Sequence, residues 1–116
     1  MRISLALFAV LALAALACSD STDSSSTNLC ANSGAAATVT ARDNYTFTPD
    51  TVTISVGQSV CWQNTGHLTH TVTEGNGRFN ANLPGGQTFV YTFVFASTFL
   101  YHCNNHSTMT GTVVVN

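Results

Sequence analysis

Residues 99–116 read FLYHCNNHSTMTGTVVVN. Two short segments within this stretch, 99–103 and 111–116, are rich in aromatic and β-branched residues and are predicted to be strands. Side chains alternate between the two faces of a strand, so Tyr101 and Cys103 share one face and His102 takes the other. If Tyr101 packs into a core, Cys103 also points inward at the end of its strand. The polar residues in between are expected to form a short loop at one end of a β-structure.

The rest of the chain repeats this pattern of short strands and turns. Turn residues such as Pro49-Asp50, Gly75-Asn76-Gly77 and Pro84-Gly85-Gly86 separate the strand-like segments. No segment of the presumed domain has a helical period. We therefore expect an all-β, antiparallel Greek-key β-sandwich of about seven or eight strands in one domain. The remaining predicted strands cover 38–43, 51–56, 59–64, 69–74 and 87–95.

The segment 87–95 supplies the clearest core signal. Its alternation places four aromatic residues on one face, and we predict that this face is buried: Phe89, Tyr91, Phe93 and Phe95.

The loop after Cys103 carries two further groups that bind metals. His106 and Met109 follow at intervals of three residues, and Met109 is one of only two methionines, the other being Met1. A loop at the end of a sandwich can turn a thiol, an imidazole and a thioether toward one point, and His70, at the start of another strand, is the candidate for the fourth ligand. Two imidazoles, a thiolate and a weak axial thioether form the ligand set of blue-copper sites. Zinc is less well matched, because structural zinc sites rarely use a thioether.

These residues carry a resemblance to a known family. The stretch YHCNNHSTMTGTVVV resembles the copper-binding C-terminus of the cupredoxins in the plastocyanin/amicyanin branch, with the short amicyanin-type spacing of its ligands. Similar pieces extend over roughly 38–116. The resemblance implies a copper ion held by His70, Cys103, His106 and Met109.

It also implies roles for residues around the ligands. Thr71 occupies the position whose backbone N–H commonly donates to the copper-bound sulfur, and Asn64 resembles the asparagine before the first ligand loop. The edge of the His106 ring, on an exposed loop, is implied as the port for electrons. His67 is a departure from the family pattern; we expect it to be exposed, the alternative being that it replaces His70 as the ligand.

The chain has four cysteines, and their pairing has to be assigned. An immunoglobulin-type disulfide from Cys61 to Cys103 is disfavoured, because Cys61 directly precedes Trp62 and faces away from the core. With Cys103 assigned to copper, Cys30 and Cys61 are expected to form a disulfide in an oxidising compartment, the alternative being two free thiols.

The N-terminus is predicted to direct export. Arg2 and an apolar run precede ALAC, as in a secretory signal peptide, which we place at 1–17. Cys18 also fits a bacterial lipobox, so a lipidated Cys18 with a Ser/Thr/Asp-rich tether over 18–34 is expected, and simple cleavage is the alternative. The remaining 35–116 would form the cupredoxin domain, periplasmic and membrane-anchored only through that lipid.

The charge composition of the chain limits the classes of partner that it could bind. The chain has three Lys+Arg and five Asp+Glu residues, a formal net charge of −2, so it lacks a basic face for nucleic acid.

We expect a monomeric type 1 copper protein that passes single electrons between redox partners in the bacterial cell envelope, and not an enzyme. A periplasmic copper carrier or storage module is the alternative. A small copper enzyme would need an acid–base group, for which Glu74 is the only conceivable candidate; Glu74 and Asp43 are otherwise expected to be solvated charges.

Overall fold

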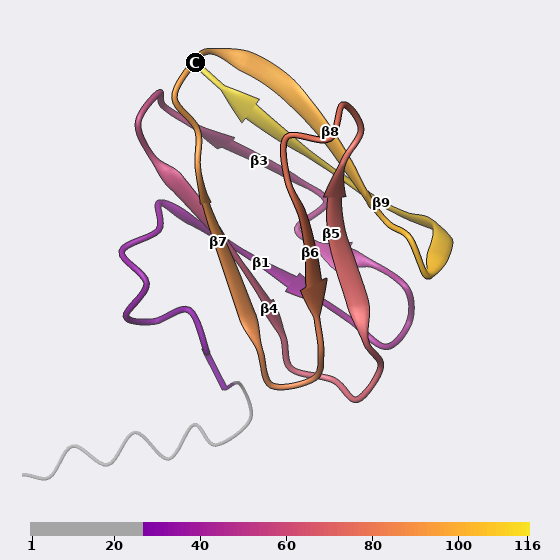
Figure 1. The fold of residues 1–116 in the computed structure, drawn as a ribbon. Coiled ribbons are helices and arrows are strands. Elements are labelled where there is room, and N and C mark those ends of the chain that lie inside the picture. The colour runs from indigo at the N-terminus through magenta and orange to yellow at the C-terminus, as the bar shows by residue number, and fades with distance from the viewer. Residues whose placement is uncertain (1–26) are drawn as a thin grey trace, which may run out of the picture.

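The structure is a computed structural model that describes residues 27–116. Two β-sheets pack face to face (Figure 1). Their strands are β1 (Ala37–Ala41), β2 (Phe47–Thr48), β3 (Thr51–Ile54), β4 (Ser59–Asn64), β5 (His70–Glu74), β6 (Asn80–Leu83), β7 (Thr88–Thr92), β8 (Ser97–Cys103) and β9 (His106–Val115). One sheet has the order β2-β1-β4-β7 and the other β3-β9-β8-β5-β6. In this part of the chain there is no helix that could span a membrane.

The predicted all-β sandwich is confirmed, with two differences in detail. Residues 27–116 form nine strands, two of which, β2 and β6, were not predicted. β2 has only two residues, and β6 reads NANL, without the β-branched residues that mark a strand. Two pairings, β1 with β4 and β3 with β9, are parallel. Alternation within one strand reports which face is buried, and it carries no information on the direction of the neighbouring strand.

The core lies between the two sheets. Trp62 on β4 is fully buried and meets Tyr101 of the opposite sheet edge-on, with ring centroids 5.3 Å apart. Around this pair gather the other large buried side chains, which include Phe47, Val72, Phe79, Leu83, Phe93, Met109 and Val113.

The aromatic face of 87–95 is buried only in part. Phe93 is 1% exposed, and Phe89 and Tyr91 pack against the core, but Phe95 is 45% exposed, so its predicted burial is wrong. β7 ends at Thr92, and beyond that point the period of two no longer holds. The Phe95 ring instead contacts Phe99 and lies under the Arg78 guanidinium.

The predicted disulfide between Cys30 and Cys61 is present. It ties the segment before β1 to the outer face of β4, where the Gln63 side chain also accepts a hydrogen bond from the Leu29 backbone N–H at 2.8 Å. The two cysteines are 31 residues apart in the chain. Closing a loop of that size contributes about 3.7 kcal/mol to the free energy of unfolding in the chain-entropy model.

Glu74, predicted to be a solvated charge, is 3% exposed, so that prediction is wrong. It ends β5 and its carboxylate accepts hydrogen bonds from the backbone N–H groups of Asn76 and Arg78, at 2.9 and 3.0 Å. The Arg78 side chain lies 3.7 Å from the same carboxylate. The tight turn between β5 and β6 therefore satisfies this buried charge.

Gly111 on β9 faces Tyr101 on β8, its partner in the pairing of the two strands. The phenol ring of Tyr101 lies so close over the Gly111 backbone that a methyl group there would overlap it. The lack of a side chain at Gly111 therefore leaves room for the Tyr101 ring, two residues before Cys103.

Gly111→Ala is therefore expected to destabilise the protein by about 1–3 kcal/mol, the usual effect of overpacking a core. Chemical denaturation followed by tryptophan fluorescence measures this change. Gly75→Ala is the matched control, because its nearest neighbour, the Leu100 carbonyl oxygen, would lie at an ordinary contact distance of 3.7 Å. Equal stability of the two variants would contradict the packing described here.

Candidate metal centre

Two connections, the β4–β5 loop and the β8–β9 turn, meet at one end of the sandwich, where β5 begins, β8 ends and β9 begins (Figure 1). Two hydrogen bonds fasten the β8–β9 turn to β5 and to the residue before it. The Asn104 backbone N–H donates to the Thr71 hydroxyl at 2.8 Å, and the Asn105 side-chain amide donates to the Thr69 carbonyl at 3.1 Å. Residues more than 30 positions apart in the sequence are thus held side by side.

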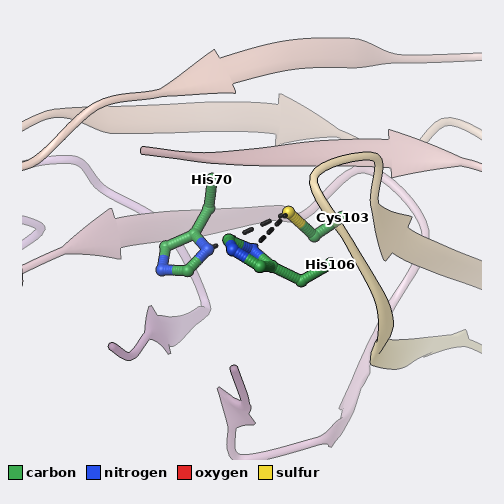
Figure 2. A group of neighbouring side chains, drawn as sticks. All are labelled: His70, Cys103 and His106. Atoms are coloured by element: carbon green, nitrogen blue, oxygen red, sulfur yellow. Dashed lines mark hydrogen bonds between the residues drawn. The ribbon is translucent and has the colours of Figure 1, made fainter. Parts of the chain in front are cut away.

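His70, Cys103 and His106 meet at this end, and their ligand atoms all lie within 4.8 Å of one another. Figure 2 shows both imidazole rings turned toward the Cys103 sulfur. The sulfur is 3.9 Å from Nδ1 of His70 and 3.6 Å from Nδ1 of His106. Cys103 is a free, buried thiol, as predicted.

These separations fit a shared metal ion. Nitrogen and sulfur ligands about 2.0–2.3 Å from one ion, at a trigonal angle of about 120°, lie roughly 3.7–3.8 Å apart. The two sulfur–nitrogen distances of 3.6 and 3.9 Å bracket that value. The mixed donor set of one thiolate and two imidazoles suits copper.

The Cys103 sulfur has one further contact within the protein. The Thr71 backbone N–H donates to it at 3.3 Å, which confirms the contact expected for Thr71. β5 therefore contributes both His70 and a backbone donor to the sulfur of the neighbouring candidate ligand.

Met109 is fully buried, three residues after His106. It was predicted to lie with His106 on a loop, and this is wrong, because β9 already begins at His106 and only Asn104 and Asn105 form the turn. The pairing of β8 with β9 is irregular here: Cys103 pairs with His106 and His102 with Thr110. The extra residues of β9, which include Met109, bulge beside Cys103.

The two other histidines stand apart from the cluster. His67, as expected, is exposed, and only its backbone N–H is bound, to the Asp43 carboxylate. His102 is half-buried on the opposite face of β8, and its ring lies 3.0 Å from the Asn104 side-chain oxygen.

The His70 ring is fully buried. Burial lowers the pKa of His70, and the nearby His106 lowers it further, whereas Asp43 and the Arg42 backbone act in the opposite direction. The influence of Arg42 is weak, because Nε2 of His70 makes no formed hydrogen bond. The lowered pKa favours the neutral imidazole, which is the form that binds a metal.

Asn64 orders the loop that leads to His70. Its side-chain amide donates to the carbonyls of Leu68 and Leu83 at 2.6 and 2.8 Å, and its oxygen accepts from the Gly66 N–H at 2.9 Å. The asparagine singled out in the sequence thus spans the β4–β5 loop from inside the protein.

Two residues beside the site were missed as contributors to it. Asp43 is solvated, as predicted, but its carboxylate also accepts backbone hydrogen bonds from the β4–β5 loop. Tyr45 lies over the His106 ring, with centroids 4.3 Å apart, so this ring is not on a freely exposed loop. Both belong to a turn between strands, and no sequence pattern connects them with residues 24 to 61 positions away.

Comparison with known proteins supports this description. Residues 5–115 match the family model described as a cupredoxin-like domain. No curated protein matches the sequence.

Solved structures give a consistent result. A purple cupredoxin from Nitrosopumilus maritimus is 26% identical, with a TM-score of 0.63, over 69% of this chain and 99% of that one. An amicyanin variant in its Cu(I) form is 29% identical, with a TM-score of 0.62, over 72% of this chain and 83% of that one. A copper-containing nitrite reductase from Thermus scotoductus is 23% identical, with a TM-score of 0.63, over 69% of this chain and 22% of its own, and shares the fold.

The match to the family model spans nearly the whole chain, and the thiol and imidazoles lie together at one end of the sandwich. Copper is the cofactor of this family, and its general role is copper binding and electron transfer. The chain belongs to the cupredoxin-like family.

Proposed function

We propose that this protein is a type 1, or blue, copper electron-transfer protein, with His70, Cys103, His106 and Met109 as ligands. The observation that carries the proposal is the convergence of the Cys103 sulfur with the two imidazole Nδ1 atoms, at 3.6 and 3.9 Å. Met109, buried in the bulge of β9, would supply a thioether to the same ion. When bound, copper supplies a one-electron redox couple.

The protein's own residues determine how well that couple works. The thiolate and thioether favour the reduced ion, while the imidazoles also suit the oxidised one, so the set is a compromise between the two states. Pairing with Leu83 on β6 fixes His70, pairing with β9 fixes Cys103, and the Thr71 N–H donates to the sulfur. Because these groups have little room to move, we expect little rearrangement on oxidation and reduction.

The position of Glu74 supports an electron carrier over a small copper enzyme. Its carboxylate, which the sequence offers as the acid–base group of such an enzyme, accepts hydrogen bonds from the turn after β5. It lies four residues beyond His70 on the same strand, about 13 Å away in an extended chain. A copper carrier or storage module remains the alternative, but the full burial of His70 and near-full burial of Cys103 suit retention of the metal better than its transfer.

We further propose that the protein acts in the bacterial cell envelope, between redox partners that are themselves unknown. The signal peptide at 1–17 and the lipid on Cys18 lie outside the described residues, and the proposal for them rests on the sequence. Residues 18–34 would lead from the anchor into the domain formed by 35–116, and their last part is already fastened to that domain through Cys30. Intact mass of the membrane fraction distinguishes a diacylglycerol-modified Cys18 from simple cleavage.

Metal analysis with the visible spectrum tests the metal assignment. The wild-type protein is expected to bind one copper per chain and to show an intense thiolate-to-copper band when oxidised. Cys103→Ser should remove this band, because an alkoxide does not replace a thiolate as a soft ligand. A blue Cys103→Ser variant would overturn the site.

A pair of histidine variants tests which imidazole binds. His70→Ala is expected to lose the blue band, whereas His67→Ala, three residues earlier in an exposed position, should keep it. The reverse result would assign the ligand to His67.

The lowered pKa of His70 predicts a pH dependence for the copper-free protein. Between the folded-state pKa and the ordinary value of 6.5, the unfolded chain binds a proton that the folded protein does not. The free energy of unfolding should therefore decrease as the pH falls below about 6.5. Urea unfolding of copper-free protein and of His70→Gln measures this contribution; an NMR titration placing the His70 pKa above 6.5 would contradict it.

A further inference from the structure

The turn between β1 and β2, residues 42–46, is built as a closed unit beside the metal centre. The Arg42 N–H donates to the Thr46 carbonyl at 3.0 Å, and the Tyr45 N–H donates to the Arg42 carbonyl at 3.1 Å. Tyr45 has a φ of +64°, in the left-handed region that bulky residues rarely adopt. Such a conformation persists only where surrounding contacts hold it. Two side chains of this turn, Asp43 and Tyr45, make contacts that lead to the proposed ligands.

The first contact fixes the loop that leads to His70. The Asp43 carboxylate accepts from the His67 N–H at 3.0 and 3.1 Å and from the Leu68 N–H at 3.1 Å. The carboxylate fills the space that a side chain on Gly66 would need. These N–H groups lower the pKa of Asp43, since they stabilise its ionised form. The charged carboxylate is therefore an anchor for a loop that has no strand pairing of its own.

The second contact fixes His106. The Tyr45 ring lies over the imidazole at a centroid distance of 4.3 Å and an interplanar angle of 35°. The His70 ring meets the same imidazole edge-on, with centroids 5.1 Å apart. His106 is thus confined between the other imidazole and a tyrosine that is itself 47% exposed.

We propose that residues 42–46 are a brace that holds both imidazoles in position, with Asp43 and Tyr45 as positioning residues. This inference rests on the proposed function, because it concerns the same site. The brace acts from outside the sheet that carries the ligands, since β1 and β2 belong to the other sheet. It keeps the imidazoles near their metal-bound positions with or without the ion, and it limits their movement during electron transfer.

Hydrogen exchange of the copper-free protein tests the Asp43 half. Asp43→Ala is expected to speed amide exchange of His67 and Leu68 by about tenfold or more, the effect of losing a charge-assisted hydrogen bond. Asp43→Asn, which keeps an acceptor oxygen, should be intermediate. Asp50→Ala is the control, because it removes an equal charge. The Asp50 carboxylate is exposed, and within residues 27–116 its oxygens accept no hydrogen bond.

The copper-loaded protein gives a second readout. The rate of electron self-exchange, measured by NMR line broadening, should fall in Asp43→Ala and match the wild type in Asp50→Ala. If Asp43 only stabilised the fold, an Asp43→Ala protein that keeps its fold and its blue colour would have the wild-type rate of self-exchange.

NMR relaxation of the His106 side chain in the copper-free protein tests the Tyr45 half. Tyr45→Gly removes the ring and suits the positive φ, so the fold is retained while the His106 order parameter is expected to fall. Tyr45→Phe keeps the stacked ring and should keep wild-type order.

Unchanged exchange in Asp43→Ala, or unchanged His106 order in Tyr45→Gly, would overturn the brace. Equal effects of Asp43→Ala and Asp50→Ala would do the same, because they would assign the change to net charge. If the wild-type protein binds no copper, the proposed function fails, yet the copper-free measurements still decide whether the brace exists.

Discussion

The metal centre depends on the register between β5 and β8. Thr73 pairs with His102 and Glu74 with Tyr101 in this antiparallel pair. Extending the same register places Thr71 beside the end of β8, where its N–H reaches the Cys103 sulfur at 3.3 Å. A slip of one residue would turn the side chains of a strand to the opposite face. The pairing that completes the sheet is thus also the one that brings the His70 imidazole to the thiol.

The core and the site stabilise each other through shared residues. Tyr101 contacts Trp62 across the sandwich and lies over Gly111, and it is two residues from Cys103 on the same face of β8. Met109 belongs to the hydrophobic core and is also the proposed axial ligand. A ligand that forms part of a close-packed interior has few alternative positions. We expect such a site to change little in shape when the ion gains or loses an electron, which is the property that an electron carrier needs.

Much of this could be predicted from the sequence because the relevant signals are local. Alternation along β8 placed Cys103 inward and His102 outward, and the short spacing to His106 and Met109 suggested a common metal. The start of β9 at His106 and the burial of Glu74 were missed although both are local, because spacing alone shows neither an irregular strand pairing nor a carboxylate that its own turn satisfies. The parallel pairings were not predictable, because they depend on segments distant in the chain. The contacts of Asp43 and Tyr45 also depend on distant segments, because nothing in the sequence of a turn indicates which loop its side chains will contact.

X-ray absorption at the copper edge tests the central claim most directly, because it reports the atoms around the ion in both redox states. The account predicts one short sulfur ligand and two imidazole nitrogens, at about 2.0–2.3 Å, with nearly the same distances after reduction. A first coordination shell of nitrogen and oxygen alone, with no short sulfur distance in either state, would contradict it.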